Sequence, residues 1–454
     1  MRRLRLRWTD RAVRSALGLP GPAQDRTYSG ITTDTRGMLP SSLFVALQGP
    51  RFDGHAFLPA ALAAGGLGAV VREDAADMPG LTLYRVPDTL RALGDLARAR
   101  RRTVTGPVVA ITGTNGKTST KEMVAAVLST HYRTHKTREN LNNLVGVPLS
   151  ILGAPDDAQA MVLEAGASVP GEISRAREVI EPDIVVITNA TVGHLEGFGS
   201  PDQVLLEKAS LAGGISLAIV GTEPRALAEL VRDRARRVIT AGLAAADRIP
   251  DRVELEGDGR PRITVGGHRF LLDARGRHQA ANAMLAWTVG LVLGLDPILM
   301  ARALESLPMP PGRGELMEQD GLTILNDGYN ANPASFRAVI DLARSLRGNR
   351  RLVFVAGTML ELGAASAGLH AEVAGQLVSL RPEVLAGVGA FVPALAPYQA
   401  SLGDRLLLAP DAESLAPLLA ARLRGDELVV LKGSRGVALE RLLPDLVTRA
   451  PPKA

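Results

Sequence analysis

Short apolar runs alternate with stretches of helical periodicity along most of the chain. Apolar runs of the length of buried strands occur at 43–47, 69–71, 108–111, 161–163, 184–187, 322–325, 352–356 and 428–431. Helical spacing predicts helices at 57–64, 90–102 and 205–209, after the strand at 108–111, and in a long Ala/Leu stretch that opens at 278–282. This alternation favours an α/β fold with mostly parallel sheets covered by helices.

The length and the linker signals divide the chain into units. A chain of 454 residues is too long for one ordinary domain, and the segment P-M-P-P-G at 308–312 is typical of a linker. We expect three units at residues 1–105, 106–312 and 313–454, the last of them Rossmann-like although it has no G-x-G-x-x-G motif. Within the second unit, residues 250–275 predict short antiparallel strands with a turn at Gly266 and Gly267.

The composition narrows the possible functions. The absence of cysteine excludes disulfides, thiolate catalysis and cysteine-ligated zinc. The net charge of +5 comes from arginine-rich sequence without a basic stripe that carries interleaved aromatic residues, so we expect no nucleic-acid partner. No uninterrupted apolar stretch reaches the length of a membrane helix, and no apolar run follows the basic segment 1–7. We therefore expect a cytoplasmic protein with no membrane association and no signal peptide.

A phosphate-binding loop is predicted between the strand at 108–111 and the helix that follows it. The sequence T-G-T-N-G-K-T at 112–118 is a shortened G-x-x-G-K-T loop, because Ile111 stands where the usual P-loop has its first glycine. Its glycines turn backbone N–H groups toward an anion, Lys117 adds a positive charge, and Thr118 offers a hydroxyl to magnesium. A plain glycine turn is the alternative, but it does not explain the lysine and the hydroxyls that follow.

Two further side chains are expected at the same edge of the sheet. Glu164 ends the strand at 161–163, and His194 follows the strand at 184–187. Because functional residues of open α/β sheets gather at the carboxyl ends of the strands, both should lie beside the phosphate loop. In the first unit, Asp34, Arg36 and His55 lie at strand and turn boundaries, where they are either surface residues or part of a ligand site.

These motifs together resemble the Mur ligases, the ATP-dependent amide-forming enzymes of peptidoglycan precursor synthesis. Three stretches are similar to the branch that joins D-Ala-D-Ala to UDP-MurNAc-tripeptide: N-L-N-N-L-V-G-V-P-L at 140–149, E-A-G-A-S-V-P-G-E-I at 164–173 and D-G-Y-N-A-N-P at 327–333. The resemblance implies a small N-terminal α/β UDP-binding domain, a central P-loop ATPase domain with a parallel sheet, and a C-terminal Rossmann-like domain. It also implies an acyl-phosphate mechanism, and we expect a monomer.

The resemblance assigns roles to particular residues. It implies ATP binding by the loop, by an adenine-contacting asparagine of the second unit and by the third unit, through Gly113, Thr114, Asn115, Gly116, Lys117, Thr118, Ser119, Asn282, Arg313 and Asp327. It implies two magnesium ions on Thr118, Glu164, His194 and Lys208, the last carbamylated, and catalytic roles for Lys117, His194 and Lys208. It implies substrate contacts from Asp34, Thr35, Arg36, His55, Asn142, Asn143, Tyr329, Asn330 and Asn332.

Two departures and two alternatives accompany the resemblance. Ser210 stands where the family usually has a glutamate two residues after the modified lysine, which affects the surroundings of Lys208. Thr358 stands where the family tends to have the aspartate of Gly-Asp-Met. A folylpolyglutamate synthase-like ligase shares the loop and is one alternative function. A P-loop NTPase switch is another, disfavoured because a whole unit precedes the loop and a second nucleotide-specificity motif is absent.

Overall fold

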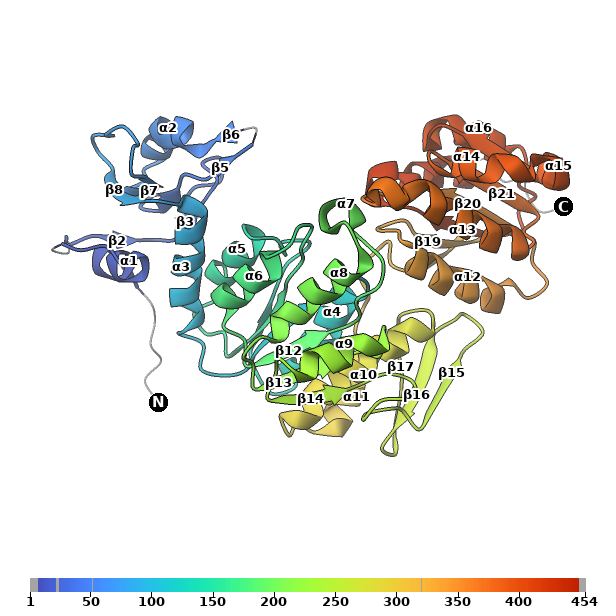
Figure 1. Cartoon of the computed structure of the whole chain (residues 1–454), viewed down its shortest axis with the longest axis horizontal. Helices are drawn as coiled ribbons and strands as arrows, with labels where there is room; N and C mark the ends of the chain where they lie inside the picture. The colour runs from blue at the N-terminus through green and yellow to red at the C-terminus, as the bar shows by residue number, and fades with distance from the viewer. Residues whose placement is uncertain (1–6, 22–23, 51, 320, 449–454) are drawn as a thin grey trace.

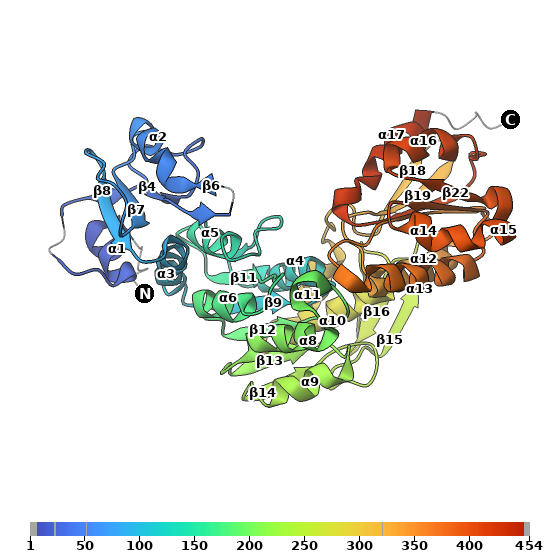
Figure 2. The same ribbon diagram turned by 45° about the horizontal axis from the view of Figure 1, so that its top comes forward.

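The computed structural model describes residues 7–21, 24–50, 52–319 and 321–448. Residues 1–6, on which most of the expectation about a signal peptide rests, lie outside the described residues. Three α/β units follow one another in chain order along the long axis of the molecule (Figure 1). In Figure 2 the first and third units rise at opposite ends of the central one. No helix in the described ranges is long and apolar enough to cross a membrane.

The first unit is built on a four-stranded parallel sheet in the order β3-β4-β7-β8. Its helix α3 also contacts α5 and α6 of the central unit, as expected for a helix that leads into the next domain. The strands are β1 Trp8–Thr9, β2 Thr27–Tyr28, β3 Ile31–Thr32, β4 Leu43–Val45, β5 Gln48–Gly49, β6 Phe52–Asp53, β7 Gly68–Arg72 and β8 Thr82–Val86. The helices are α1 Asp10–Leu17, α2 Leu58–Ala63 and α3 Thr89–Arg101.

The central unit holds a six-stranded, fully parallel sheet in the order β10-β11-β9-β12-β13-β14. The strands are β9 Val108–Thr112, β10 Thr134–Lys136, β11 Ala160–Glu164, β12 Ile184–Ile187, β13 Leu217–Val220 and β14 Arg237–Thr240. The helices are α4 Lys117–Ser129, α5 Gly146–Leu152, α6 Glu172–Ile180, α7 Leu195–Phe198, α8 Pro201–Ala209, α9 Arg225–Arg232, α10 Arg277–Val292 and α11 Pro297–Glu305.

Alternate residues of the central strands enter two separate cores. Val108 and Ala110 of β9 pack on the side of α5, α6 and α8, whereas Val109 and Ile111 pack on the side of α4 and α10. Continuous apolar strands are required here because helices cover both faces of the sheet. Since β9 lies between β11 and β12, the loop after β9 opens at the point where the strand order reverses, the usual place for a ligand in an open α/β sheet.

The predicted antiparallel strands at 250–275 are confirmed. They form the three-stranded sheet β15 Arg252–Leu255, β16 Pro261–Val265 and β17 His268–Leu271. Gly266 and Gly267 join β16 to β17 with φ of +55° and +79°, a two-residue hairpin turn in which both residues have positive φ.

The third unit is a six-stranded sheet in the order β18-β19-β23-β20-β21-β22. Its parallel part agrees with the predicted alternation, but the edge strand β18 is antiparallel to β19 and was not predicted. The strands are β18 Glu315–Gln319, β19 Leu322–Asp327, β20 Leu352–Gly357, β21 Val384–Val388, β22 Leu406–Ala409 and β23 Leu428–Lys432. The helices are α12 Pro333–Arg347, α13 Ser366–Ser379, α14 Phe391–Leu395, α15 Gln399–Leu402, α16 Ala412–Ala420 and α17 Leu443–Thr448.

Candidate functional site

The loop between β9 and α4 has the conformation that its glycines permit. Gly113 has φ of +149°, and a Cβ at this position would lie 1.9 Å from Thr188 Oγ1. Gly116 precedes α4 with φ of +78°, and a Cβ there would lie 2.5 Å from Asn282 Oδ1. Both glycines are therefore required by close approach as well as by conformation, and the loop opens directly at a helix N-terminus, as an anion site requires.

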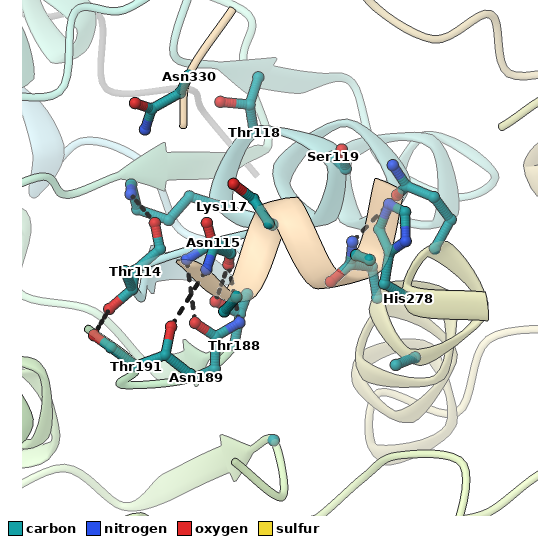
Figure 3. Close-up of a pocket in the computed structure, with 18 of the residues that line it drawn as sticks. Thr114, Asn115, Lys117, Thr118, Ser119, Thr188, Asn189, Thr191, His278 and Asn330 are labelled. Atoms are coloured by element: carbon teal, nitrogen blue, oxygen red, sulfur yellow. Dashed lines mark hydrogen bonds between the residues drawn. The ribbon is translucent and has the colours of Figure 1, made fainter. Parts of the chain in front are cut away.

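The residues that follow β12 hold this loop in place, as Figure 3 shows. The backbone N–H of Asn115 donates to Asn189 Oδ1 at 3.0 Å, and its carbonyl accepts from Thr188 Oγ1 at 2.5 Å and from Asn189 Nδ2 at 3.1 Å. Thr114 Oγ1 donates to the carbonyl of Thr191 at 2.9 Å. The shape of the loop is thus fixed by hydrogen bonds to the residues that follow β12.

Lys117 lies over its own loop. Its Nζ donates to the carbonyls of Gly113 at 2.8 Å and Thr114 at 3.0 Å. Burial lowers the pKa of Lys117, and the negative charge of Glu164 opposes that shift. These two carbonyl partners hold the ammonium group beside the turn where a phosphate would be bound.

Glu164 and Thr118 form a set of oxygen ligands beside the loop. Thr118 Oγ1 donates to Glu164 Oε2 at 3.0 Å, and Asn142 Nδ2 donates to Glu164 Oε1 at 2.8 Å. The side chain of Glu164 is 2% exposed and ends β11, the strand paired with β9. A buried carboxylate beside a hydroxyl offers the hard oxygen donors that magnesium prefers, so these residues fit that ion.

A buried lysine that is absent from the sequence-based predictions lies behind this pair. Lys121 Nζ is 3.9 Å from Glu164 Oε2 and 3.2 Å from Glu122 Oε1, and it donates to the carbonyl of Thr137 at 2.8 Å. Only 1% of its surface is exposed. Lys121 lies one helical turn after Lys117 on α4. Its proximity to Glu164 could not be predicted from the local sequence, because it depends on the pairing of β11 with β9.

His194 lies at the N-terminus of α7 and contacts the third unit. It has φ of +53°, and its Nδ1 contacts the carboxylate of Glu361. That contact is the main cause that lowers the pKa of Glu361. His194 and Glu164 line the same cleft, but no three His, Asp or Glu side chains within the described residues gather closely enough to hold a metal ion. A second magnesium site beside His194 would therefore need at least one ligand other than a His, Asp or Glu side chain.

Lys208 is a buried amine on α8. It is 1% exposed, and its Nζ lies 5.5 Å from the centre of the Phe198 ring. Burial, and then the positive charge of Lys117, lower the pKa of Lys208 to about 7, against the opposing charges of Glu207 and Glu172. A substantial neutral fraction is therefore present near neutral pH, as carbamylation requires.

The two departures from the family pattern both have structural partners. Ser210 Oγ donates to the carbonyl of Glu207 at 2.7 Å, so it completes the end of α8. Thr358 Oγ1 accepts the backbone N–H of Ala390 at 2.9 Å and so connects the ends of β20 and β21.

The third unit contributes a second wall of polar groups. Lys432 Nζ donates to Asp327 Oδ2 at 2.7 Å, which joins the ends of β19 and β23. The Arg313 guanidinium lies 4.0 Å from the centre of the Tyr329 ring, and Arg435 lies 5.4 Å from it. These contacts fix the D-G-Y-N-A-N-P segment opposite the phosphate loop.

The structure brings most of the predicted residues into one cleft of about 980 Å³. It is lined, among others, by Thr114, Asn115, Gly116, Lys117, Thr118, Ser119, Asn142, Asn143, Glu164, His194, Asn282, Arg313, Asp327, Tyr329 and Asn330. Gly113, Lys208 and Asn332 are not among its lining residues. His278, at the start of α10, lines it without having been predicted as a site residue.

Four predicted substrate residues lie elsewhere, in the first unit. Asp34 and Arg36 pair with each other on the surface, and the Arg36 contacts lower the pKa of Asp34 to about 2. His55 has both ring nitrogens engaged, since Nδ1 lies 2.6 Å from Asp53 Oδ1 and Nε2 accepts the backbone N–H of Arg72 at 3.0 Å. Thr35 is partly exposed between Asp34 and Arg36. A ligand that contacts both these first-unit residues and the residues of the cleft must extend from the first unit to the cleft.

Comparison with known proteins identifies the family. The Mur ligase family catalytic domain matches residues 27–101, the Mur ligase middle domain matches 111–290, and the Mur ligase glutamate ligase domain matches 312–435. The UDP-N-acetylmuramoyl-tripeptide–D-alanyl-D-alanine ligase of Bacillus subtilis is 34% identical over 445 residues, which cover 94% of this chain and 95% of the relative.

Solved structures agree with this match. MurF from Acinetobacter baumannii is 28% identical with a TM-score of 0.87, covering 97% of this chain and 99% of that one. MurF from Thermotoga maritima, in complex with ADP, is 26% identical with a TM-score of 0.81, covering 92% and 97%. The chain belongs to the Mur ligase family and is an ATP-dependent ligase. Over nearly its full length it is similar to the MurF enzymes.

Proposed function

We propose that this ligase joins D-Ala-D-Ala to UDP-MurNAc-tripeptide at the expense of ATP, giving UDP-MurNAc-pentapeptide, ADP and phosphate. The observation that carries the proposal is the preformed phosphate loop with Glu164 3.0 Å from Thr118, in a chain similar over its full length to ligases of that name. That full-length similarity favours this reaction over a folylpolyglutamate synthase-like ligase and over an NTPase switch. The product belongs to peptidoglycan synthesis, on which bacterial cell shape and division depend.

The nucleotide would occupy the cleft between the central and third units. We assign the phosphates to the loop 113–119, including Lys117, and the rest of the nucleotide to Asn282, Arg313 and Asp327, of which Asn282 already packs against Gly116. We assign the first magnesium to Thr118 and Glu164. When bound, magnesium supplies positive charge that offsets the repulsion between ATP and an anionic acceptor.

A second magnesium would use His194 and a carbamylated Lys208. The neutral amine of Lys208 adds to carbon dioxide, the new N–C bond leaves a carbamate, and one proton is released. The carbamate replaces a positive charge with two oxygen ligands and a negative charge, which suits magnesium. The buried position of Lys208 and its pKa of about 7 support this step.

The reaction then proceeds in two steps at the acceptor carboxylate. A carboxylate oxygen attacks the γ-phosphorus, the bond to the β-phosphate bridge breaks, and an acyl phosphate and ADP result. The amine of D-Ala-D-Ala attacks the acyl carbon through a tetrahedral intermediate, phosphate leaves, and the nitrogen loses a proton. Lys117 offsets the developing negative charge. An α-amino group has a pKa of about 7.7–8.0, so a useful fraction of the attacking amine is neutral near pH 8 without a strong base. Positioning of the reacting groups would then supply much of the rate.

The remaining predicted residues would bind the two acceptors. We assign the UDP part to the first unit, at Asp34, Thr35, Arg36 and the turn that His55 holds. We assign the peptide and D-Ala-D-Ala to residues that line the cleft, namely Asn142, Asn143, Tyr329 and Asn330. We expect a monomer that acts in the cytoplasm, where ATP is available.

The test is ATP consumption by the full chain with UDP-MurNAc-tripeptide, measured with and without D-Ala-D-Ala. Phosphate release that requires both acceptors, together with formation of the pentapeptide, supports the proposal. Phosphate release that is independent of both acceptors would indicate an NTPase switch. Turnover that depends on folate and glutamate would indicate the folylpolyglutamate synthase-like alternative.

A further inference from the structure

The side chains of Asn115 and Asn332 form a reciprocal amide pair between the phosphate loop and the third unit. Asn115 Nδ2 donates to Asn332 Oδ1 at 3.2 Å, and Asn332 Nδ2 donates to Asn115 Oδ1 at 2.7 Å. The two residues are 217 positions apart in the chain. The pair is therefore a contact between the central and third units, and not part of a local turn.

The other partners of the pair fix its orientation. Asn332 Oδ1 also accepts the backbone N–H of Ser335 at 2.9 Å, which caps α12. If the amide of Asn332 were turned over, its NH₂ group would face that N–H, so only one orientation satisfies the cap. Asn115 must then present its carbonyl oxygen to the NH₂ of Asn332, as it does.

Asn115 uses all of its polar groups within the protein. Its backbone N–H and carbonyl are held by Asn189 and Thr188, and its Nδ2 donates to Thr191 Oγ1 at 3.1 Å as well as to Asn332. The side chain is therefore directed toward the third unit. This suggests a role in docking for a residue that the loop sequence predicted to bind nucleotide directly.

We propose that Asn332 is a positioning residue, which holds the third unit docked on the phosphate loop through Asn115. Residues of α7 and its N-terminus also contact the third unit, since His194 contacts the carboxylate of Glu361 and the backbone N–H of Glu196 donates to the carbonyl of Glu361 at 3.0 Å. The amide pair differs from those contacts because it involves the phosphate loop itself. Loss of docking would separate Arg313 and Asp327 from the loop. The inference rests on the proposed function only where ligation is measured.

Two substitutions separate docking from helix capping. Asn332→Asp and Asn332→Ser both keep a good N-cap for α12. The carboxylate of the first lacks the donor to Asn115 and faces its carbonyl oxygen, and the hydroxyl of the second is too short to reach. Ser335→Ala is the matched control, because it removes the reciprocal half of the capping box and leaves the amide pair intact.

The distance between the units is measured by single-molecule fluorescence transfer on the full chain without ligands. The sequence has no cysteine, so Arg236→Cys in the central unit and Asp404→Cys in the third provide two unique labelling sites, both exposed. We expect the ratio of docked to undocked molecules to fall about fivefold or more in both Asn332 variants, the effect of losing two neutral hydrogen bonds. Ser335→Ala should keep the original ratio.

Thermal unfolding and ligation complete the test. The unfolding temperature of both Asn332 variants should stay at that of the parent, while kcat for ligation falls in step with the docked fraction. An unchanged distance distribution in both Asn332 variants overturns the inference. If the distribution shifts but the parent does not ligate D-Ala-D-Ala, the docking role stands and the proposed function fails.

Discussion

The ammonium group of Lys121 lies 3.9 Å from the carboxylate of Glu164, and both side chains are almost completely buried. Glu164 thus has Thr118 and Asn142 as hydrogen-bond donors on the cleft side and a lysine behind it. Lys121 in turn is 3.2 Å from Glu122, which also contacts the half-exposed Lys136. A row of four alternating charges therefore connects the surface to the phosphate loop.

We predict that Lys121→Met destabilises the central unit by about 3–5 kcal/mol, because it removes the buried positive charge that lies between the carboxylates of Glu164 and Glu122. Urea unfolding is followed by the fluorescence of Trp287 in a Trp8→Phe background, since these are the only two tryptophans. The matched control Lys136→Met should cost about 1 kcal/mol or less, as is usual for an exposed pair. Equal losses in the two variants would contradict the burial of the charge as the cause.

Lys117→Ala should abolish phosphoryl transfer and leave the fold intact. The substitution removes the positive charge beside the phosphates, whereas the loop itself remains held by Thr188, Asn189 and Thr191. The measurements are ATP-dependent ligation and the unfolding temperature of the variant. Lys136→Ala serves as the control and should ligate normally. Near-normal ligation by Lys117→Ala would mean that the loop is a structural turn.

Glu164→Gln should raise the magnesium concentration needed for half-maximal ligation by about tenfold or more, since even second-shell changes at metal sites cost that much. The reason is the loss of a charged oxygen ligand beside Thr118. Magnesium titrations of ligation at saturating ATP provide the measurement, with Glu229→Gln on the exposed face of α9 as the control.

His194→Ala should shift the same titration in the same direction. Magnesium prefers oxygen, so an imidazole ligand is unusual, and the contact of His194 with Glu361 offers another reason for its position. A magnesium titration that His194→Ala leaves unchanged would assign the residue to the contact between the units and not to the metal.

Lys208→Arg should be inactive, because arginine keeps the positive charge and does not form a carbamate in this way. Lys208→Ala should be nearly inactive, and a short carboxylic acid in the buffer should restore part of its activity by occupying the vacated oxygen positions. Ligation rates with and without added formate or acetate provide the measurement. Full activity of Lys208→Arg would exclude carbamylation as a requirement.

The unmodified Lys208 should also make stability depend on pH. Burial lowers its pKa to about 7 from the model-compound value of 10.5. Between pH 7 and pH 10.5 the unfolded chain binds more protons at this residue than the folded chain does, so stability rises with pH across that window. Below about pH 7 Lys208 is charged in both states, and the full free-energy cost of burying its charge lowers the stability of the fold. In buffer free of carbon dioxide, Lys208→Met should therefore raise the unfolding temperature more at about pH 6 than at about pH 9.5.

The control for that comparison is Arg236→Met, an exposed position on the same unit, whose effect should be the same at both pH values. If Lys208→Met raised the unfolding temperature equally at both, Lys208 would not be a strongly desolvated amine in the folded chain.

Local sequence determined the phosphate loop and the strands that carry its neighbours. The β-branched run at 108–111 can only be buried, Gly113 and Gly116 mark the turn, and the helix after them follows from its apolar spacing. The hairpin at Gly266 and Gly267 and the placement of Glu164 at a strand end were predictable for the same reason. Such features depend on a few consecutive residues, and the physical chemistry of the backbone decides them.

Tertiary structure alone decided which of these pieces meet. The order β11-β9-β12 places Glu164 beside Thr118 and turns Lys121 into a buried counter-charge, a result that no local pattern contains. The packing of the third unit on the central one likewise directs Asn115 to Asn332, and the fold of the first unit engages both ring nitrogens of His55. Each of these contacts joins residues distant in sequence or depends on burial, and burial is a property of the whole packed chain because it requires the surrounding elements to exclude water.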